Sequence, residues 1–229
     1  MDQYDLGKIL YENPLASESD VRDFRLEGDA AISFPQGRMR LENKRSPEEG
    51  QAANYVLWCP KLFPSDIAVS WDFYPIREPG LAMFWFAANG KDGKDLFDPS
   101  FAPRTGQYQQ YHHGDINALH ISYFRRNTNK ERTFQTCNMR KSYGFHLVCQ
   151  GADPIPTATY AEPPYRIQVI KDGAEVTFSI NNLQIFRWED DGESYGPVLG
   201  GGRIGFRQMA PLIAEYANLT VHRTKGGIE

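Results

Sequence analysis

The stretch YHHGDINALHISYFRRN, residues 111–127, holds three of the five histidines of a 229-residue chain, together with an aspartate and two arginines. It leads into a locally basic run, from Phe124 to Lys141, that carries Arg125, Arg126, Lys130, Arg132, Arg140 and Lys141. Guanidinium groups bind carboxylates through two parallel hydrogen bonds. The run is therefore a candidate site for a small anionic substrate, and the alternative is a solvated loop.

The elements that must position these residues read as strands, because polar and apolar residues alternate with period two between Gly, Pro, Asn and Asp turns. In residues 118–126 the alternation predicts Leu119, Ile121 and Tyr123 inward, and His120, Ser122, Phe124 and Arg126 on the opposite face. In residues 143–150 it predicts Phe145, Leu147 and Cys149 inward, and His146, Val148 and Gln150 outward.

The clearest strands lie in the C-terminal third. Residues 165–192 read as three strands joined by turns at Asp172-Gly173 and Asn181-Asn182, which is typical of an antiparallel meander. Two more strands follow, in GGGRIGFRQM and AEYANLTVHR. We expect an all-β, antiparallel two-sheet sandwich, and a single domain over residues 1–229, because no repeat, linker or break in composition divides the chain.

Composition excludes several classes of function. The formal net charge is −4, so duplex nucleic acid is not an expected partner. No stretch approaches the roughly 18 apolar residues of a membrane span, and the first residues show neither a basic start nor an apolar run, which predicts a cytoplasmic protein. Three cysteines without short paired spacing argue against a disulfide framework and a zinc site.

Several segments together resemble the YesU-like family of bacterial proteins, which has a galectin-like or concanavalin-like jelly-roll fold. They are LYENPL, DVRDFRLEGDAAISFPQGRMRLEN, GDINALHISYFRRN, MRKSYGFHLVCQGADPIP and PVLGGGRIGFRQMAPLIAEYANLTV. The resemblance covers nearly the whole chain and implies a jelly roll with a concave face of the kind that holds sugars. It implies a glycan as partner, with no nucleic acid and no membrane, and leaves the oligomeric state open. On that concave face the outward residues of strands 118–126 and 144–150 are expected to be neighbours; they are His120, Arg126, His146 and Gln150.

Cleavage of a uronic-acid oligosaccharide by β-elimination is the leading hypothesis for this face. Elimination needs a base that removes the proton α to the carboxylate, cations that stabilise the enolate, and an acid near the leaving oxygen. We expect His120 or His146 as the base, Arg126 or Arg140 on the carboxylate, and Tyr143 or Tyr111 as the acid. This hypothesis requires both histidines in one accessible cleft.

Hydrolysis is the alternative reaction, and it needs two carboxylates held about 5 to 9 Å apart. The acids Glu189, Asp191 and Glu193 have suitable spacing, but Asp190 and Gly192 between them indicate a turn. A non-catalytic sugar-binding module is the alternative from another class of function.

Aromatic rings stack on the apolar side of a pyranose, so exposed aromatic residues are candidate contacts. Further substrate contacts are expected from amides and from a histidine in the loop before the central strand. The candidates are Trp71, Trp85, Phe124, Asn117, Gln208 and His113. Arg207 and Gln208 alternate, so one of them at most faces the cleft.

A metal at His112, His113 and Asp115 fits by ligand type. Adjacent residues of an extended chain point to opposite faces, however, which argues against both histidines binding one ion. No cofactor is expected, and the sequence leaves room for a structural calcium ion.

Overall fold

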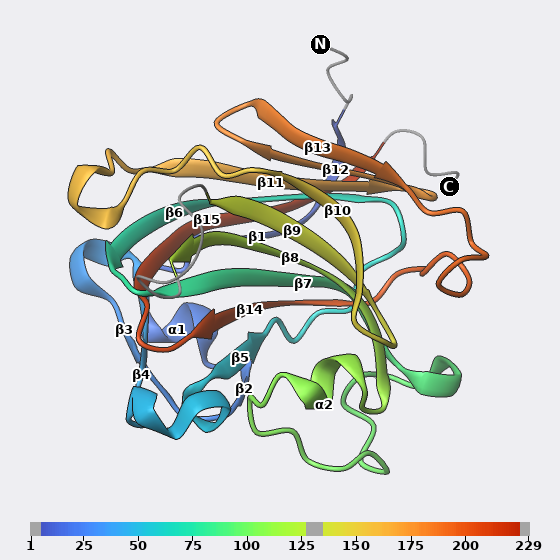
Figure 1. Cartoon of the computed structure of the whole chain (residues 1–229), viewed down its shortest axis with the longest axis horizontal. Coiled ribbons are helices and arrows are strands. Elements are labelled where there is room, and N and C mark those ends of the chain that lie inside the picture. The colour runs from blue at the N-terminus through green and yellow to red at the C-terminus, as the bar shows by residue number, and fades with distance from the viewer. Residues whose placement is uncertain (1–5, 127–134, 225–229) are drawn as a thin grey trace.

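Two antiparallel β-sheets stack face to face in the computed structural model, which describes residues 6–126 and 135–224 (Figure 1). The larger sheet has eight strands in the order β13-β12-β11-β6-β15-β4-β3, with β1 also paired to β15. Its strands are β1 (Leu6–Asn13), β3 (Ala30–Ser33), β4 (Met39–Asn43), β6 (Ile67–Arg77), β11 (Tyr165–Asp172), β12 (Glu175–Ile180), β13 (Leu183–Glu189) and β15 (Ile213–Thr224).

The second sheet has seven strands in the order β10-β9-β8-β7-β14-β5-β2. They are β2 (Arg25–Glu27), β5 (Tyr55–Trp58), β7 (Gly80–Gly90), β8 (Ile116–Arg126), β9 (Thr136–Ser142), β10 (His146–Ala152) and β14 (Arg203–Met209). The helices are short: α1 (Glu18–Val21), α2 (Gln109–His112) and four 3₁₀ turns, η1 (Pro35–Gly37), η2 (Pro47–Ala53), η3 (Lys91–Gly93) and η4 (Ala158–Tyr160). The all-β two-sheet architecture expected from the sequence is confirmed.

The meander at the C-terminal end of the sequence is also confirmed. Strands β11, β12 and β13 pair in order, and the turn between β12 and β13 places Asn181 and Asn182 at positive φ (50° and 63°). Two positive φ angles in a two-residue turn match the right-handed twist of hairpin strands, and asparagine tolerates them well. The meander could be predicted from the sequence because the residues that favour such turns are recognisable locally.

The main core lies between the two sheets. In β6 the alternating residues Ile67, Val69, Trp71 and Phe73 are buried there, as the period-two pattern predicts. Side chains of the seven-stranded sheet that face this core are on its inner face. The opposite side of the same sheet is called its outer face below.

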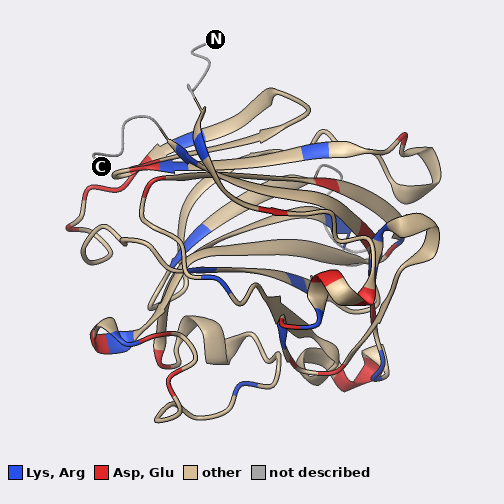
Figure 2. Ribbon diagram, turned by 180° about the vertical axis from the view of Figure 1, so that it is seen from behind, with Lys and Arg blue, Asp and Glu red and all other residues tan. Residues whose placement is uncertain are grey.

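Charged residues are interspersed over the ribbon in Figure 2, without one region of a single sign. Within the part of the chain that the structure describes, no helix is long and apolar enough to cross a membrane.

Candidate functional site on the outer face of the seven-stranded sheet

Strand register decides which side chains share the outer face. Trp85 of β7 pairs with His120 of β8, and His120 pairs with Arg140 of β9. Paired residues on antiparallel strands point to the same side of a sheet. Leu119, the neighbour of His120, belongs to the core between the sheets. Trp85, His120 and Arg140 therefore form one row across the outer face.

A second apolar cluster covers part of this face, because the segment between β7 and β8 folds back over it. Leu96 and Tyr111 of that segment pack on side chains from β5, β7 and β8. The full cluster is Val56, Trp58, Met83, Trp85, Ala88, Leu96, Tyr111, Ile116 and Ala118. Strand β7 is apolar on both parities for this reason: each of its faces lies against a separate core.

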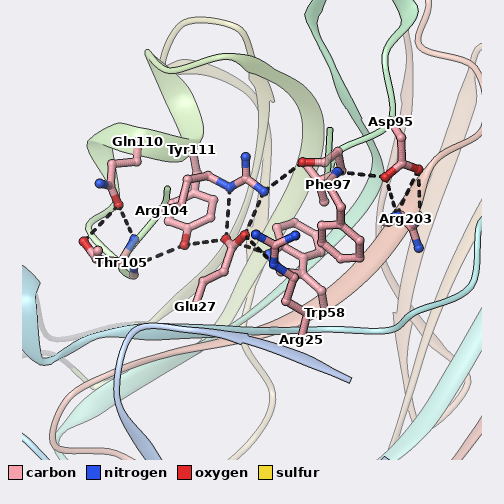
Figure 3. Close-up of polar contacts among 12 residues, drawn as sticks. Arg25, Glu27, Trp58, Asp95, Phe97, Arg104, Thr105, Gln110, Tyr111 and Arg203 are labelled. Atoms are coloured by element: carbon pink, nitrogen blue, oxygen red, sulfur yellow. Dashed lines mark hydrogen bonds and ion pairs between the residues drawn. The ribbon is translucent and has the colours of Figure 1, made fainter. Parts of the chain in front are cut away.

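Glu27 anchors the covering segment to the sheet edge (Figure 3). Its carboxylate accepts two hydrogen bonds from the Arg104 guanidinium, at 2.7 and 3.0 Å. It also accepts one from the Trp58 indole and one from the Tyr111 hydroxyl, both at 2.9 Å. Glu27 is 3% exposed, so four donors satisfy a carboxylate that water does not reach.

Three arginines gather beside this cover, and we call Arg125, Arg140 and Arg207 the cationic patch. The Arg207 guanidinium lies 4.7 Å from the centre of the Tyr108 ring. The Arg140 guanidinium lies 3.8 Å from the ring of Phe145, which in turn contacts Tyr108. Burial raises the pKa of Tyr108 to about 12, and the charges of Arg207, Arg140 and Arg125 act to lower it. Tyr108 thus lies within the field of all three cations.

The partners of the patch arginines are neutral. Arg125 donates to the Thr136 hydroxyl at 3.0 Å, and Arg140 donates to the Phe145 carbonyl at 2.9 Å. Arg207 donates to Gln51 Oε1 at 3.2 Å and to the Gly106 carbonyl at 3.3 Å. Over residues 6–126 and 135–224, no carboxylate forms an ion pair with any of the three.

His120 lies at the floor of the patch, beneath Tyr108. Its Nε2 lies 2.6 Å from the Tyr108 hydroxyl, and its ring stacks on Trp85 at 4.0 Å. Burial, with further contributions from Arg140 and Arg207, holds the pKa of His120 well below its ordinary value. The imidazole is neutral at pH 7, and at 1% exposure it is sealed from solvent.

The predicted pairing of His120 with His146 is wrong. His146 pairs with Lys141, whose neighbour on β8 is the core residue Leu119, so His146 is on the inner side of the sheet. There its ring stacks on Tyr195 at 4.3 Å. The prediction assumed that the apolar residues of this strand face the core. Strand β10 is an edge strand, however, and the apolar side chains of Leu147 in it and of Phe145 just before it are exposed.

The predicted orientation of Phe124 and Arg126 is also wrong, because β8 does not alternate strictly. Phe124 has a positive φ of 46°, and the pairing of β8 with β7 shifts register at this point. A one-residue shift exchanges the two faces of a strand. Phe124 is therefore in the core, and Arg125 takes the outer position. Arg126 is buried instead, with Asp153 Oδ2 at 3.1 Å.

The structure places three further residues that were predicted to contact substrate away from the outer face. Trp71 is buried between the sheets, 4.2 Å from the Phe84 ring. Gln208 is buried on the inner face, where its amide meets the hydroxyls of Tyr55 and Tyr216 at 2.6 and 2.9 Å. Asn117 shares the core side of β8 with Leu119.

Trp85 has the outer orientation that was expected, but the covering segment leaves it 0% exposed.

Four predicted contacts do lie on or beside the outer face. Arg140 is in the patch, and Gln150 lies beside it, with its amide 2.6 Å from that of Asn138. Tyr143 is 47% exposed, and its ring contacts both His113 at 5.5 Å and the Lys91 ammonium at 3.9 Å.

Three residues of this site did not enter the predicted set in their present roles: Arg207, Tyr108 and Arg125. Alternation already required that only one of Arg207 and Gln208 face outward, and it is Arg207. Arg125 stood in the basic run, but the shift at Phe124 leaves no mark in the sequence. Lys130 and Arg132 of that run lie outside the described residues.

Local contacts hold the side chains of the acidic turn and of the histidine pair. Asp190 is buried and accepts from Lys141 Nζ at 2.7 Å, and Asp191 binds the backbone of the following turn, as the turn prediction required. His112 and His113 contact each other through Nδ1. Among the described side chains, no group of three His, Cys, Asp or Glu residues is arranged to hold a metal ion.

Comparison with known proteins identifies similar chains. The model of a family described as "Domain of unknown function (DUF1961)" matches residues 8–221. The uncharacterized protein YesU of Bacillus subtilis is 54% identical over 220 residues, which span 96% of this chain and 98% of YesU. A crystal structure of a B. subtilis protein of unknown function with a galectin-like fold superposes with a TM-score of 0.92, at 54% identity and with 96% and 98% of the two chains covered.

A more distant structure shares the fold alone. The carbohydrate-binding module CBM66 from B. subtilis superposes with a TM-score of 0.53 at 12% identity, over 87% of this chain and 95% of the module.

Proposed function

The chain belongs to the DUF1961 family, with YesU as a relative and a galectin-like fold, and from that premise we propose that it binds an anionic oligosaccharide on the outer face of its seven-stranded sheet. The ligand class we propose is a uronic-acid oligosaccharide. Its carboxylates meet the cationic patch, and its rings lie against the exposed aromatic side chains beside it.

The observation that carries this proposal is the charge of the patch. Arg207 contacts the Tyr108 ring, and Arg140 contacts Phe145 beside it. All three patch arginines have neutral partners, and no described carboxylate neutralises them. Cations left without counter-charges attract an anionic ligand and fix its orientation. A uronate supplies a planar carboxylate that matches the guanidinium fork.

Exposed aromatic residues support the sugar part of the ligand. Tyr143 and Phe145 are 47% and 45% exposed on the β9–β10 hairpin, next to Arg140. A ring face of this kind stacks on the C–H side of a pyranose, while amides such as that of Gln150 bind hydroxyl groups. CBM66 of the same fold is named a carbohydrate-binding module, which is consistent with this use of the fold.

Binding without cleavage fits the geometry better than elimination or hydrolysis. His120 is sealed beneath Tyr108, and His146 is on the other side of the sheet, so neither reaches a ligand on the patch as a base. The pair of carboxylates that hydrolysis needs is missing from the described part of the patch.

The proposal is tested by calorimetric titration of the protein with a uronic-acid trisaccharide and with its methyl ester. We expect the free acid to bind, and the ester, which lacks the charge, to bind much more weakly. Arg140→Gln should weaken binding of the acid roughly tenfold, as expected for one charge-assisted contact. Arg77→Gln, on β6 of the other sheet, is the matched control and should leave the affinity unchanged.

Equal affinity for acid and ester, or no binding of either, would contradict the proposal. The same mixtures are followed by absorbance near 235 nm and by chromatography. We expect neither new absorbance nor a change in mobility. A signal lost in the Arg140→Gln variant would show that the patch is an active site.

A further inference from the structure

Arg207 is a buried cation whose hydrogen bonds are incomplete. It is 1% exposed, and its Nε has no hydrogen-bond partner in the part of the chain described. Its Nη1 meets the thioether sulfur of Met83 at 3.2 Å, which is a weak acceptor. A buried charge without a counter-charge destabilises the folded state. The free protein therefore holds Arg207 in an unfavourable state that an anion would relieve.

Gln51 Oε1 occupies the place that an anionic oxygen would take. Besides Arg207 Nη2 at 3.2 Å, it accepts from the backbone N–H of Tyr108 at 3.3 Å and from Asn54 Nδ2 at 3.0 Å. Three donors from three separate segments thus converge on one neutral oxygen. Gln51 is an exposed residue of η2, next to Gly50 at a φ of +61°, so its side chain can leave without disturbing the core.

Two other buried polar atoms beside Arg207 also lack partners. His120 Nδ1 and Trp85 Nε1 have no hydrogen-bond partner among the described residues, although both side chains are fully enclosed. Their rings stack on each other at 4.0 Å, on the same face as Arg207. Unpaired polar atoms are uncommon in native interiors, and a bound ligand is one way in which such atoms are satisfied.

We propose that Arg207 forms an inner anion subsite closed by Gln51, and that a carboxylate of the bound oligosaccharide displaces the Gln51 amide oxygen. The carboxylate then accepts from Arg207, from the Tyr108 N–H and from Asn54. The inference rests on the proposed function and deepens it, because it separates an inner residue that recognises the carboxylate from the half-buried Arg140. In this enclosed place the charge pair is stronger than it is at the surface.

The test introduces a carboxylate from the protein itself at the position that we propose for the carboxylate of the ligand. Gln51→Glu keeps the length of the side chain and supplies Arg207 with a counter-charge. We expect this variant to have a higher melting temperature than the wild type. We also expect it to bind the uronic-acid trisaccharide roughly tenfold to a hundredfold more weakly, because its own carboxylate competes for the subsite.

The control is Gln110→Glu, which adds the same charge to the neighbouring helix α2. Gln110 Oε1 accepts from Thr105 N at 2.8 Å and from the Thr105 hydroxyl, and neither of these bonds involves Arg207. This variant should not reproduce the rise in melting temperature. Gln51→Ala, which opens the subsite without filling it, should bind the trisaccharide at least as tightly as the wild type.

The outcomes separate this inference from the proposed function. If the wild type binds the trisaccharide and Gln51→Glu binds it equally well, or is no more stable than the wild type, the inner subsite is wrong and the proposed function stands. If the wild type binds no uronate, the proposed function is wrong, and so is the inner subsite for the uronate carboxylate.

Discussion

Glu27 shows how much of the outer face depends on a single side chain. Its carboxylate joins an edge strand, β2, to the covering segment through Arg104 and Tyr111, and to β5 through Trp58 (Figure 3). Arg104 is itself 7% exposed in its side chain, so its charge depends on this partner. Removing one member of a buried pair leaves the other unpaired, which costs more than the pair itself contributes.

Glu27→Gln should therefore destabilise the protein by about 3–5 kcal/mol, the range found when a buried ion pair loses one partner. Urea unfolding followed by tryptophan fluorescence measures the change. Glu42→Gln, whose ion pair with Arg77 is exposed, is the control and should change stability by less than about 1 kcal/mol. Similar losses in the two variants would mean that Glu27 does not hold the cover.

Acid should weaken the protein through His120. The pKa of His120 is held well below its ordinary value by burial, so the unfolded chain binds a proton at a pH where the folded one does not. Stability from this histidine is complete above the ordinary histidine pKa of about 6.5 and is lost as the pH falls below it. His112, with a pKa lowered to about 4, chiefly by burial, acts in the same direction.

The measurement is the free energy of unfolding at several pH values between 7 and 5. The wild type should lose stability over this range, and His120→Gln, which keeps a polar group near Tyr108 but does not titrate, should show a smaller slope. An unchanged slope in the variant would show that His120 is not held neutral by the fold.

At the scale of elements, the covering segment fits the sheet through one glycine. Gly106 has a φ of +88°, and a Cβ added there would lie 2.0 Å from the Asn54 carbonyl oxygen. The backbone of the covering segment thus packs directly on the backbone that precedes β5. This contact fixes how closely Tyr108 and the Gly106 carbonyl approach Arg207.

Gly106→Ala should destabilise the protein by about 2 kcal/mol more than Gly93→Ala, the difference being steric overlap. Gly93 has a similar φ of +73° but open space around it, so its variant reports only the cost of the left-handed backbone, about 1–2 kcal/mol. Chemical denaturation of both variants gives the comparison. Equal losses would mean that the segment is not closely seated at Gly106.

For single elements, the sequence predicted the strands well, but it predicted only part of the side-chain orientations within them correctly. The alternation of β6 and the turns of the C-terminal meander are local signals, and both were correct. The predicted faces of Phe124 and Arg126 in β8 and of His146 in β10 were wrong because they depend on non-local facts: a register shift at Phe124, and the position of β10 at a sheet edge. Trp85 had the expected orientation, but no pattern within β7 shows that a later segment covers it.

At the scale of the whole molecule, the chain carries a net charge of −4, and yet three arginines of one sheet face have no ion pair with a carboxylate of residues 6–126 or 135–224. Family and fold could be recognised from the sequence because the resemblance extends over nearly the whole chain. The composition of the site could not, because Arg125, Arg140 and Arg207 come from three different strands that only the folded sheet brings together.

Binding of the uronic-acid trisaccharide to the cationic patch should weaken as the salt concentration rises. Raising the ionic strength from about 0.05 to 0.5 M shortens the screening length below the roughly 10 Å found at 0.1 M, so attraction by Arg140, which is only half-buried, should weaken. We expect the affinity of the wild type to fall several-fold and that of Arg140→Gln to fall less. Calorimetric titrations at both salt concentrations decide this, and identical slopes would argue against Arg140 as a ligand contact.

The apolar character of β7 on both faces has a consequence for the order in which the protein comes apart. Phe84 and Phe86 are enclosed by one core, and Met83 and Trp85 by the other, so this central strand has no solvent-facing side along much of its length. Its backbone amides should exchange with deuterium only when the entire chain unfolds, whereas those of β10 at the sheet edge exchange through local opening. We therefore expect β7 to keep its structure until global unfolding, after the edge strands have opened.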